Sequence, residues 1–399
     1  MTADQPNRSP PQVPGTVKGL SLVSLFNDLA SEMVYPLLPA FVTRTLGGGP
    51  LVLGLLDGAA ELTSSAVKWI SGRLTDRPGW QRPLILAGYG LAVLVRPLIA
   101  GAGSALQVVG LRVADRIGKG LRTPPRDAMI AQITPPAVTG RAFGFHRAAD
   151  HFGAVVGSLA AWFLLSRGAE VRSVIALSVV PGLVAFGLLA VVLKGGQAGS
   201  NAAAHHQSPL PSTRPSVRPP DRFWPPVIAL TALTFFRLPE ALLILRLQDR
   251  GVGVTAIPLV WAGLHVVRSA SSYPGGRLSD RFGPRRMVAA GGLLFALVAI
   301  VFGGALTPGQ AVALFLVLGL VAGLTESAER AVVAKLAPVR TGRGFGAYHA
   351  LIGAAALPSG LLFGGLYQSA SGPTALWASA GGMMLAVVIW LVVSRSEED

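Results

Sequence analysis

Acidic residues recur at helical spacing inside stretches of this chain that are otherwise apolar. Asp28 and Glu32 are four residues apart, and Asp57 and Glu61 repeat that spacing. Residues four apart share one face of a helix. Because two carboxylates in a low-dielectric interior do not both ionise cheaply, one of each pair should hold a proton unless a cation lies between them. The pairs therefore predict sites that exchange a proton for a bound compound or an arginine partner.

Cations and histidines occupy the neighbouring apolar stretches. Arg112 is the expected counter-ion for the carboxylates of the first half. His146 and Asp150 are also four apart, with Arg147 beside them, and we expect this pair to share a proton nearer neutral pH. The second half carries fewer such groups, so we expect the coupling chemistry mainly in the first half.

Ionisable residues inside a membrane are costly, and this cost makes them functional by default. The competing interpretation is a set of neutral, salt-bridged networks that only fix helix packing. Under the functional interpretation, the residues expected at a proton-coupling and substrate cavity are Asp28, Glu32, Asp57, Glu61, Arg112, His146, Arg147, Asp150, Glu240, His265 and Glu326.

The elements that must position these groups are membrane helices. Hydrophobic residues make up 51% of the chain and charged residues 13%, whereas a soluble domain carries about 25% charge. A membrane-spanning helix needs about 20 mostly apolar residues. Twelve such spans are predicted, at 18–43, 52–73, 83–102, 105–121, 140–166, 172–193, 224–248, 254–276, 286–305, 309–335, 341–369 and 373–394.

The distribution of Lys and Arg predicts the orientation. If both termini and the loop between the sixth and seventh spans share one side, 20 Lys and Arg lie there and four lie opposite. Such an excess marks the cytoplasmic face, and twelve spans place both termini on that face of the cell membrane. The net charge of +15 does not indicate nucleic-acid binding, because the charges lie in short loops between apolar segments.

Two phrases of the sequence occur twice. Residues 72–77, Gly-Arg-Leu-Thr-Asp-Arg, return as Gly-Arg-Leu-Ser-Asp-Arg at 276–281, and residues 139–144 return at 341–346. The offsets are 204 and 202 residues, which indicates two copies of one unit, as in transporters built from repeated halves. The expected organisation is a tail at 1–17, a first unit at 18–194, a flexible tether at 195–222, a second unit at 223–394 and a tail at 395–399.

Residues 72–82 resemble the signature loop of the major facilitator superfamily. The copy at 276–286 is closer still, with Gly283 and Arg285-Arg286 in place, whereas Trp80-Gln81 depart from the usual basic pair. The resemblance covers the whole chain. It implies an all-α membrane protein whose twelve transmembrane helices form two pseudo-symmetric six-helix bundles.

The resemblance also implies that the signature loops lock the cytoplasmic side in the outward-open state. Opposite charges at matched positions of the repeat, Arg126-Asp127 and Glu329-Arg330, are expected to pair within each half or across it and to help close that gate. The expected gate residues are Gly72, Asp76, Arg77, Gly79, Gly276, Asp280, Arg281, Gly283, Arg126, Asp127, Arg141 and Arg343.

Two further motifs favour export. Residues 36–39, Pro-Leu-Leu-Pro, resemble a motif of the twelve-span drug:proton antiporters, and residues 153–158 are similar to the superfamily's antiporter motif, with Ser158 at the usual Pro. The fourth span departs from that branch, with Lys119 and Arg122 at positions where Gln and Gly are usual.

We therefore expect a monomeric secondary transporter that exports a small organic compound by proton antiport. The alternatives are proton-coupled uptake or facilitated transport of a small, anionic solute, or a transporter-like receptor without a transport cycle. No phosphate-binding loop, nucleophile motif or metal-ligand cluster is apparent, so the sequence predicts neither an enzyme nor an ATP-driven pump, and no cofactor.

Overall fold

The computed structural model describes residues 12–135, 138–203, 223–304, 307–336 and 341–394, and these residues form helices joined by short connections. The helical elements are α1 (Gly15–Val34), η1 (Tyr35–Leu37), α2 (Leu38–Ala40), η2 (Phe41–Thr45), α3 (Pro50–Thr75), α4 (Gln81–Leu98), η3 (Ile99–Gly101), α5 (Ala105–Ile133), α6 (Thr139–Ser166), α7 (Val171–Leu177), α8 (Val179–Ala203), α9 (Trp224–Phe235), α10 (Glu240–Asp249), η6 (Val254–Ala256), α11 (Ile257–Phe282), α12 (Pro284–Gly303), α13 (Pro308–Leu336), α14 (Thr341–Ser369) and α15 (Gly372–Val393).

Helices lie at all twelve ranges predicted to span a membrane, but not all of them are apolar. In the described part of the chain, eight helical segments are long and apolar enough to cross a membrane. The four ranges that fail are 18–43, 52–73, 105–121 and 254–276. These ranges carry many of the charged residues singled out above, which face inward and lower the hydropathy of their helices.

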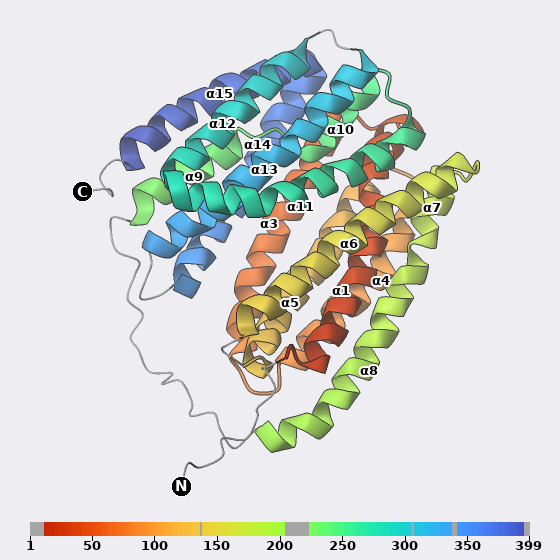
Figure 1. Cartoon of the computed structure of the whole chain (residues 1–399). Helices are drawn as coiled ribbons and strands as arrows, with labels where there is room; N and C mark the ends of the chain where they lie inside the picture. The colour runs from red at the N-terminus through yellow and green to blue at the C-terminus, as the bar shows by residue number, and fades with distance from the viewer. Residues whose placement is uncertain (1–11, 136–137, 204–222, 305–306, 337–340, 395–399) are drawn as a thin grey trace.

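The helices of the two halves of the chain gather on opposite sides of the molecule (Figure 1). In the first half, α1 packs on α6 and α8, and α5 packs on α3 and α4. In the second half, α13 packs on α11 and α12, while α15 packs on α9 and α12. The two groups meet through α3 against α14 and α6 against α11.

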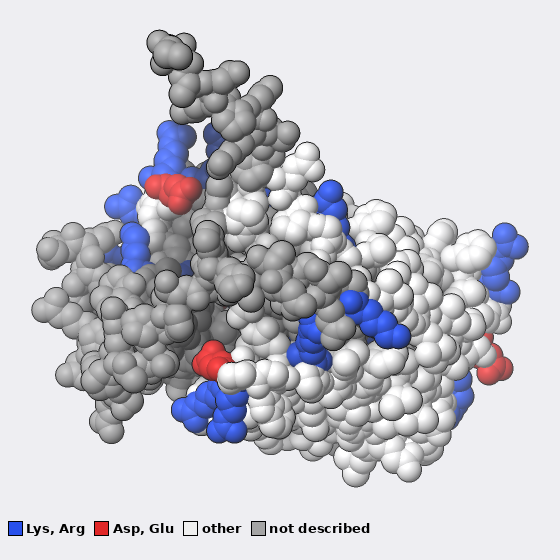
Figure 2. Space-filling model, turned by 90° about the horizontal axis from the view of Figure 1, so that it is seen from below, with Lys and Arg blue, Asp and Glu red and all other residues white. Residues whose placement is uncertain are grey.

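The surface between the two ends is poor in charge. One face of the molecule shows a broad area without charged side chains, which separates the charged residues at one edge from those nearer the other (Figure 2). Many large apolar side chains are exposed, among them Leu94, Val191 and Leu297. A band of this kind suits contact with lipid.

The span predicted at 224–248 is confirmed as the apolar segment Trp224–Asp249, but its helix is broken between Phe235 and Glu240. Pro239 precedes α10 and has no N–H to continue the helix. The carbonyls released by the break are bonded: the hydroxyls of Ser359 and Ser379 donate to the oxygens of Phe235 and Phe236, at 2.6 and 2.5 Å. Broken membrane helices need such partners, since no water is present to bond their backbone.

Two other predicted boundaries differ. The sixth predicted span is two helices, α7 and α8, and α8 continues to Ala203, inside the range predicted as a tether. The rest of that range, 204–222, lies outside the described residues. The fourth predicted span, 105–121, continues as α5 to Ile133 through Pro124 and Pro125.

A side chain from α3 explains why the helix α5 continues through its prolines. Pro124 has no N–H for the carbonyl of Gly120, four residues earlier. The hydroxyl of Ser71 donates to that oxygen at 2.7 Å. Ser71 is fully buried, so the bond replaces the missing helical one without water.

Replacing Ser71 with alanine should therefore lower stability. The change leaves a buried carbonyl unpaired, which costs about 1–3 kcal/mol, and thermal unfolding of the detergent-solubilised protein would show a lower midpoint. Thr123→Ala is the matched control, because the Thr123 hydroxyl bonds the Lys119 carbonyl of its own helix, which keeps its helical N–H partner. Equal midpoints for the two variants would contradict the assignment.

Candidate functional site

A cavity of about 840 Å³ lies between the two groups of helices and is lined from both. Its walls come from α1, α3, α5 and α6 of the first half, and from the α9–α10 break, α11, α13 and α14 of the second. Ten of the eleven residues expected at a coupling and substrate cavity line it: Asp28, Glu32, Asp57, Glu61, Arg112, Arg147, Asp150, Glu240, His265 and Glu326.

Helical periodicity brings these side chains to the cavity in stripes. Asp28, Glu32 and Tyr35 line one face of α1 and its continuation. Arg112, Arg116 and Lys119 do the same on α5, and α11 contributes Trp261, His265 and Arg268 at the same spacing of four and three. This spacing keeps successive residues on one face of a helix.

The cavity is closed at one end and open at the other. The open end is the one where α3 and α11 finish, near Thr75 and Phe282, and we call it the terminal end because α1 begins and α15 finishes there. Toward it, the lining side chains of Arg147 and Arg330 are 58% and 60% exposed. Toward the opposite end, Tyr35 and Trp261 are 7% and 2% exposed.

Glycines allow the helices to seal the closed end. A Cβ on Gly54 of α3 would lie 1.9 Å from the carbonyl oxygen of Gly360 on α14, and a Cβ on Gly360 would lie 2.1 Å from that of Gly54. The predicted antiporter-like stripe serves a related packing role, since a Cβ at Gly153 or Gly157 of α6 would meet backbone oxygens of α1 at 2.3 Å. Small residues permit this backbone approach in membranes.

Two carboxylates of the first half are held by donors of the second. The indole Nε1 of Trp261 donates to Glu32 at 2.8 Å, and His265 Nε2 lies 3.8 Å from the same oxygen. The backbone N–H of Ala241, in the first turn of α10, donates to Asp57 at 2.9 Å. The hydroxyl of Tyr35 also donates to Asp57, at 3.1 Å. A helix N-terminus favours such an anion.

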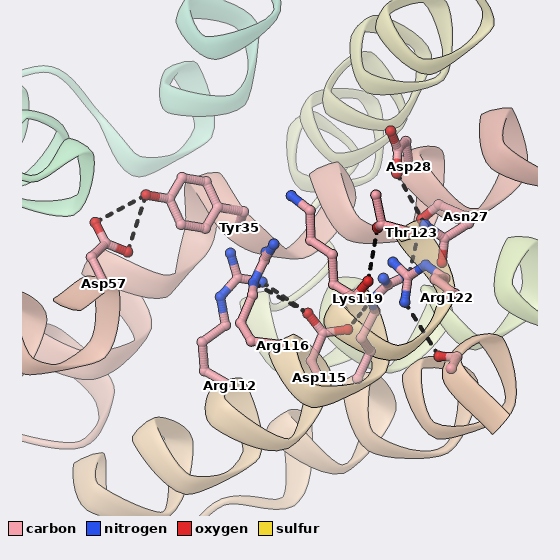
Figure 3. A network of polar contacts seen from close by, with 12 residues as sticks. Asn27, Asp28, Tyr35, Asp57, Arg112, Asp115, Arg116, Lys119, Arg122 and Thr123 are labelled. Atoms are coloured by element: carbon pink, nitrogen blue, oxygen red, sulfur yellow. Dashed lines mark hydrogen bonds and ion pairs between the residues drawn. The ribbon is translucent and has the colours of Figure 1, made fainter. Parts of the chain in front are cut away.

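Arg112, the expected counter-ion of the first-half carboxylates, pairs with one of them, Asp115, which does not line the cavity (Figure 3). Asp115 is 1% exposed and lies among three arginines, with contacts of 2.8 Å to Arg96, 3.4 Å to Arg112 and 3.6 Å to Arg116. The ring of Tyr35 stacks under Arg112 as well, 4.8 Å from the guanidinium carbon. Asp115 is not among the site residues expected from the sequence.

The other cavity charges divide into paired and unpaired groups. Arg147 lies 3.6 Å from Asp150, Arg268 donates to Glu240 at 2.8 Å, and Arg330 lies 3.5 Å from Glu326. Within the described residues, Asp28 and Glu61 form no ion pair, although Lys119 is near enough to attract both. Asp28 accepts from the Asn27 amide at 3.0 Å and Glu61 from the Ser65 hydroxyl at 3.4 Å.

His146 does not reach the cavity, which corrects its predicted place there. It is 1% exposed and its Nδ1 lies 3.3 Å from the Ser21 hydroxyl. Its Nε2 is 3.8 Å from Asp150, beyond hydrogen-bond distance. Adjacent residues of a helix lie about 100° apart around its axis. Arg147, Asp150 and His151 line the cavity, while His146 packs against α1.

The predicted gate residues lie at the terminal end. Gly79 and Gly283 hold positive φ angles of 82° and 84° in the turns after α3 and α11. Asp76, Asp280 and the adjacent arginines, Arg77 and Arg281, are exposed. A Cβ at Gly72 would lie 3.9 Å from the Pro124 side chain, in ordinary contact, whereas a Cβ at Gly276 would meet nothing within 4 Å.

The charged residues at the matched positions 126–127 and 329–330 bond within their own halves of the chain. Arg126 donates to its neighbour Asp127 at 2.9 Å, and Glu329 lies 3.7 Å from Arg237 and accepts from the Tyr348 hydroxyl at 2.6 Å. All these bonds stay within one half of the chain. Arg141 is exposed, and the side chain of Arg343 lies outside the described residues.

Several cavity residues were not predicted as site residues. They are Tyr35, Arg116, Lys119, His151, Arg237 and Arg268, whereas Arg330 was predicted at the gate instead. The four-and-three spacing on α11 was a usable signal, because it sets a polar stripe along an otherwise apolar helix. Among the described residues, no group of three His, Asp or Glu is arranged to hold a metal ion.

The family follows from comparison with known proteins. The family model described as Major Facilitator Superfamily matches residues 20–267 and 241–399. The chain belongs to the major facilitator superfamily. This membership and the apolar helices make it a multi-pass membrane transporter of small molecules rather than an enzyme.

Known proteins are similar to the transporter over different shares of its length. It is 26% identical to an uncharacterized MFS-type transporter of Methanocaldococcus jannaschii, over 94% of this chain and 93% of that protein. It is 33% identical to the multidrug resistance protein MdtH of Aeromonas hydrophila, over 37% of each chain. A solved POT family transporter in complex with 5-aminolevulinic acid shares the fold, with a TM-score of 0.77, 11% identity and 97% and 98% of the two chains covered.

Proposed function

We propose that this transporter exports a small organic compound in exchange for protons, as a monomer in the cell membrane. Its twelve spans form two six-helix units, residues 18–194 and 223–394, joined by residues 195–222. The terminal end faces the cytoplasm, since 20 Lys and Arg belong to that side and four to the other. The open end of the cavity is then cytoplasmic, and the end sealed by Gly54 and Gly360 faces outward.

The observation that carries the proton coupling is the bonding of Glu32 and Asp57. Both are carboxylates of the first unit, and both accept hydrogen bonds from the second unit at the outward side of the cavity. Hydrogen bonds to an ionised acceptor are about twice as strong as neutral ones. The ionised groups therefore hold the outward side closed, and a proton on either weakens that closure.

This arrangement suits antiport. After the protons leave to the cytoplasm, the ionised Glu32 and Asp57 bond the second unit, and we call these bonds the latch. The empty carrier therefore stays with its outward side closed. Only a compound that competes for the cavity charges releases the latch and carries the transporter outward. There the compound leaves and protons from outside bind the carboxylates. The protonated carrier closes its outward side with weakened bonds, and the closure becomes firm only when the protons leave to the cytoplasm and Glu32 and Asp57 ionise again. The two units rock about the cavity, as in transporters built from repeats.

The direction of export is supported by relatives. Besides MdtH, a protein named multi-drug resistance efflux pump PmrA of Streptococcus pneumoniae is 29% identical over 37% of each chain. The motifs at 36–39 and 153–158 agree with that direction. During the outward-open state, the exposed loops around Asp76 and Asp280 close the cytoplasmic side, together with Arg141, Arg343 and the pairs at 126–127 and 329–330.

Neutralising the latch should uncouple the carrier. Glu32→Gln and Asp57→Asn keep the shape of the side chain but lose the charge, and we expect each to weaken the bond by about 1 kcal/mol, or roughly fivefold in the closed-to-open ratio. In proteoliposomes with an imposed pH gradient, compound-driven proton flux should fall while compound leakage persists. Glu170→Gln removes an exposed carboxylate that belongs neither to the cavity nor to the gate, and it serves as control. Flux that does not depend on the gradient in the unmodified protein would refute the proposal.

The second candidate function, uptake of an anionic solute, is favoured by one observation. Arg96, Arg112 and Arg116 share the single carboxylate Asp115, which leaves positive charge beside the cavity. Accumulation of an organic anion by cells that express the transporter, without efflux of any compound, would support uptake over export.

A further inference from the structure

We propose that the transported compound is a small hydrophilic zwitterion, whose acidic group binds Arg116 and Lys119 and whose basic group binds Glu61 and Asp28. The inference rests on the proposed transport function and names the substrate class for the same cavity.

Charged side chains of both signs line much of the cavity. Among the described residues, seven carboxylates and seven Lys or Arg side chains line it, with two histidines. The two large aromatic side chains in its wall, Tyr35 and Trp261, are already bonded to Asp57 and Glu32. Sites for lipophilic compounds are lined mostly by hydrophobic and aromatic groups. A lipophilic ligand here would strip water from charged groups without bonding them, which is costly.

Internal pairing leaves both signs of charge available. Three carboxylates have basic partners in the cavity, namely Asp150, Glu240 and Glu326, and Glu32 and Asp57 accept bonds across the two units. The carboxylates without such partners are Asp28 and Glu61, on α1 and α3. Each accepts one bond from a neutral side chain of its own helix.

On the basic side, α5 holds the surplus. Asp115 alone serves three arginines, and its contact with Arg116 is the longest of the three, at 3.6 Å. Lys119 has no ion pair within the described residues, and Figure 3 shows its amine turned away from Asp115, with no dashed line to it. The cavity therefore offers an anion site on α5 and cation sites on α1 and α3, which flank it.

Matched probes test the assignment. Thermal unfolding of the full-length protein would be followed with three zwitterions, glutamine, alanyl-glutamine and trialanine, and with the C-terminal amide and N-acetyl form of each. We expect at least one zwitterion to stabilise the protein, because a ligand raises the midpoint in proportion to the logarithm of its excess. Each blocked form of that compound should bind about tenfold or more weakly, since it leaves charged groups unpaired.

Substitutions in the cavity test which residues bind the acidic group of the zwitterion and which bind the basic group. Lys119→Gln should weaken the N-acetyl form and leave the amide unaffected, and Glu61→Gln should do the reverse. Arg167→Gln removes a charge outside the cavity and should change neither. Stabilisation by ethidium or tetraphenylphosphonium with none by any zwitterion would overturn the proposal, as would equal binding of the blocked and free forms.

Failure of the zwitterion proposal is separable from failure of export. Proton flux driven by ethidium would keep the antiport function and exclude this substrate class. Tight zwitterion binding without gradient-driven flux would keep the substrate class and exclude antiport.

Discussion

Gly54→Ala is expected to trap the transporter with its outward side open. The new Cβ would lie 1.9 Å from the Gly360 carbonyl oxygen, which belongs to backbone and has no flexible side chain to move aside. Overpacking of this kind costs about 1–3 kcal/mol, or roughly a hundredfold at the upper end. The cost falls only on the state in which α3 and α14 touch, so the equilibrium shifts to the other state.

The absence of cysteine makes this shift measurable with one introduced thiol. Thr234→Cys places a thiol in the cavity wall, and a membrane-impermeant maleimide should label it from outside far faster in the Gly54→Ala background. Transport should fall to near zero while the protein keeps its thermal midpoint, because alanine is about 1 kcal/mol better than glycine within a helix.

Gly110→Ala is the control for this prediction. Gly110 is also within a helix, α5, but a Cβ there would meet nothing within 4 Å. This variant should transport as well as the unmodified protein. Normal transport by Gly54→Ala would show that α3 and α14 do not close the outward side as described.

Asp115→Asn is expected to cause the largest loss of stability of any single carboxylate change. The substitution leaves Arg96, Arg112 and Arg116 without their common counter-ion in a buried place. Breaking a buried ion pair by removing one partner costs about 3–5 kcal/mol. The yield of folded protein and the unfolding midpoint in detergent should both fall sharply.

A second substitution distinguishes a charge effect from a general disturbance. Arg96 is 3% exposed and makes the shortest contact with Asp115, so Arg96→Met in the Asp115→Asn background removes one of the uncompensated charges. Part of the lost stability should return. Asp127→Asn, which removes a half-exposed carboxylate paired with its neighbour, should cost far less. A midpoint for Asp115→Asn equal to that of Asp127→Asn would contradict the role of Asp115.

The sequence was informative wherever the deciding interaction is local. Hydropathy predicted helices at all twelve ranges, and spacing of three and four placed Asp28 with Glu32 and Asp57 with Glu61 on shared faces that line the cavity. Whether a proline ends a helix could not be predicted from the local sequence. Pro239 ends a helix at the α9–α10 break, whereas Pro124 is accepted because Ser71 of another helix bonds the freed carbonyl.

What the sequence by itself determined was a helical membrane protein and a set of ionisable residues within its helices. Only the tertiary structure decided how those residues are used. Asp57 meets the N–H of Ala241 across 184 residues of chain, Asp115 gathers arginines from two helices, and His146 faces α1 rather than the cavity. Periodicity defines the face of one helix, but the partner of that face depends on helix crossings, and these are set by packing between distant parts of the chain.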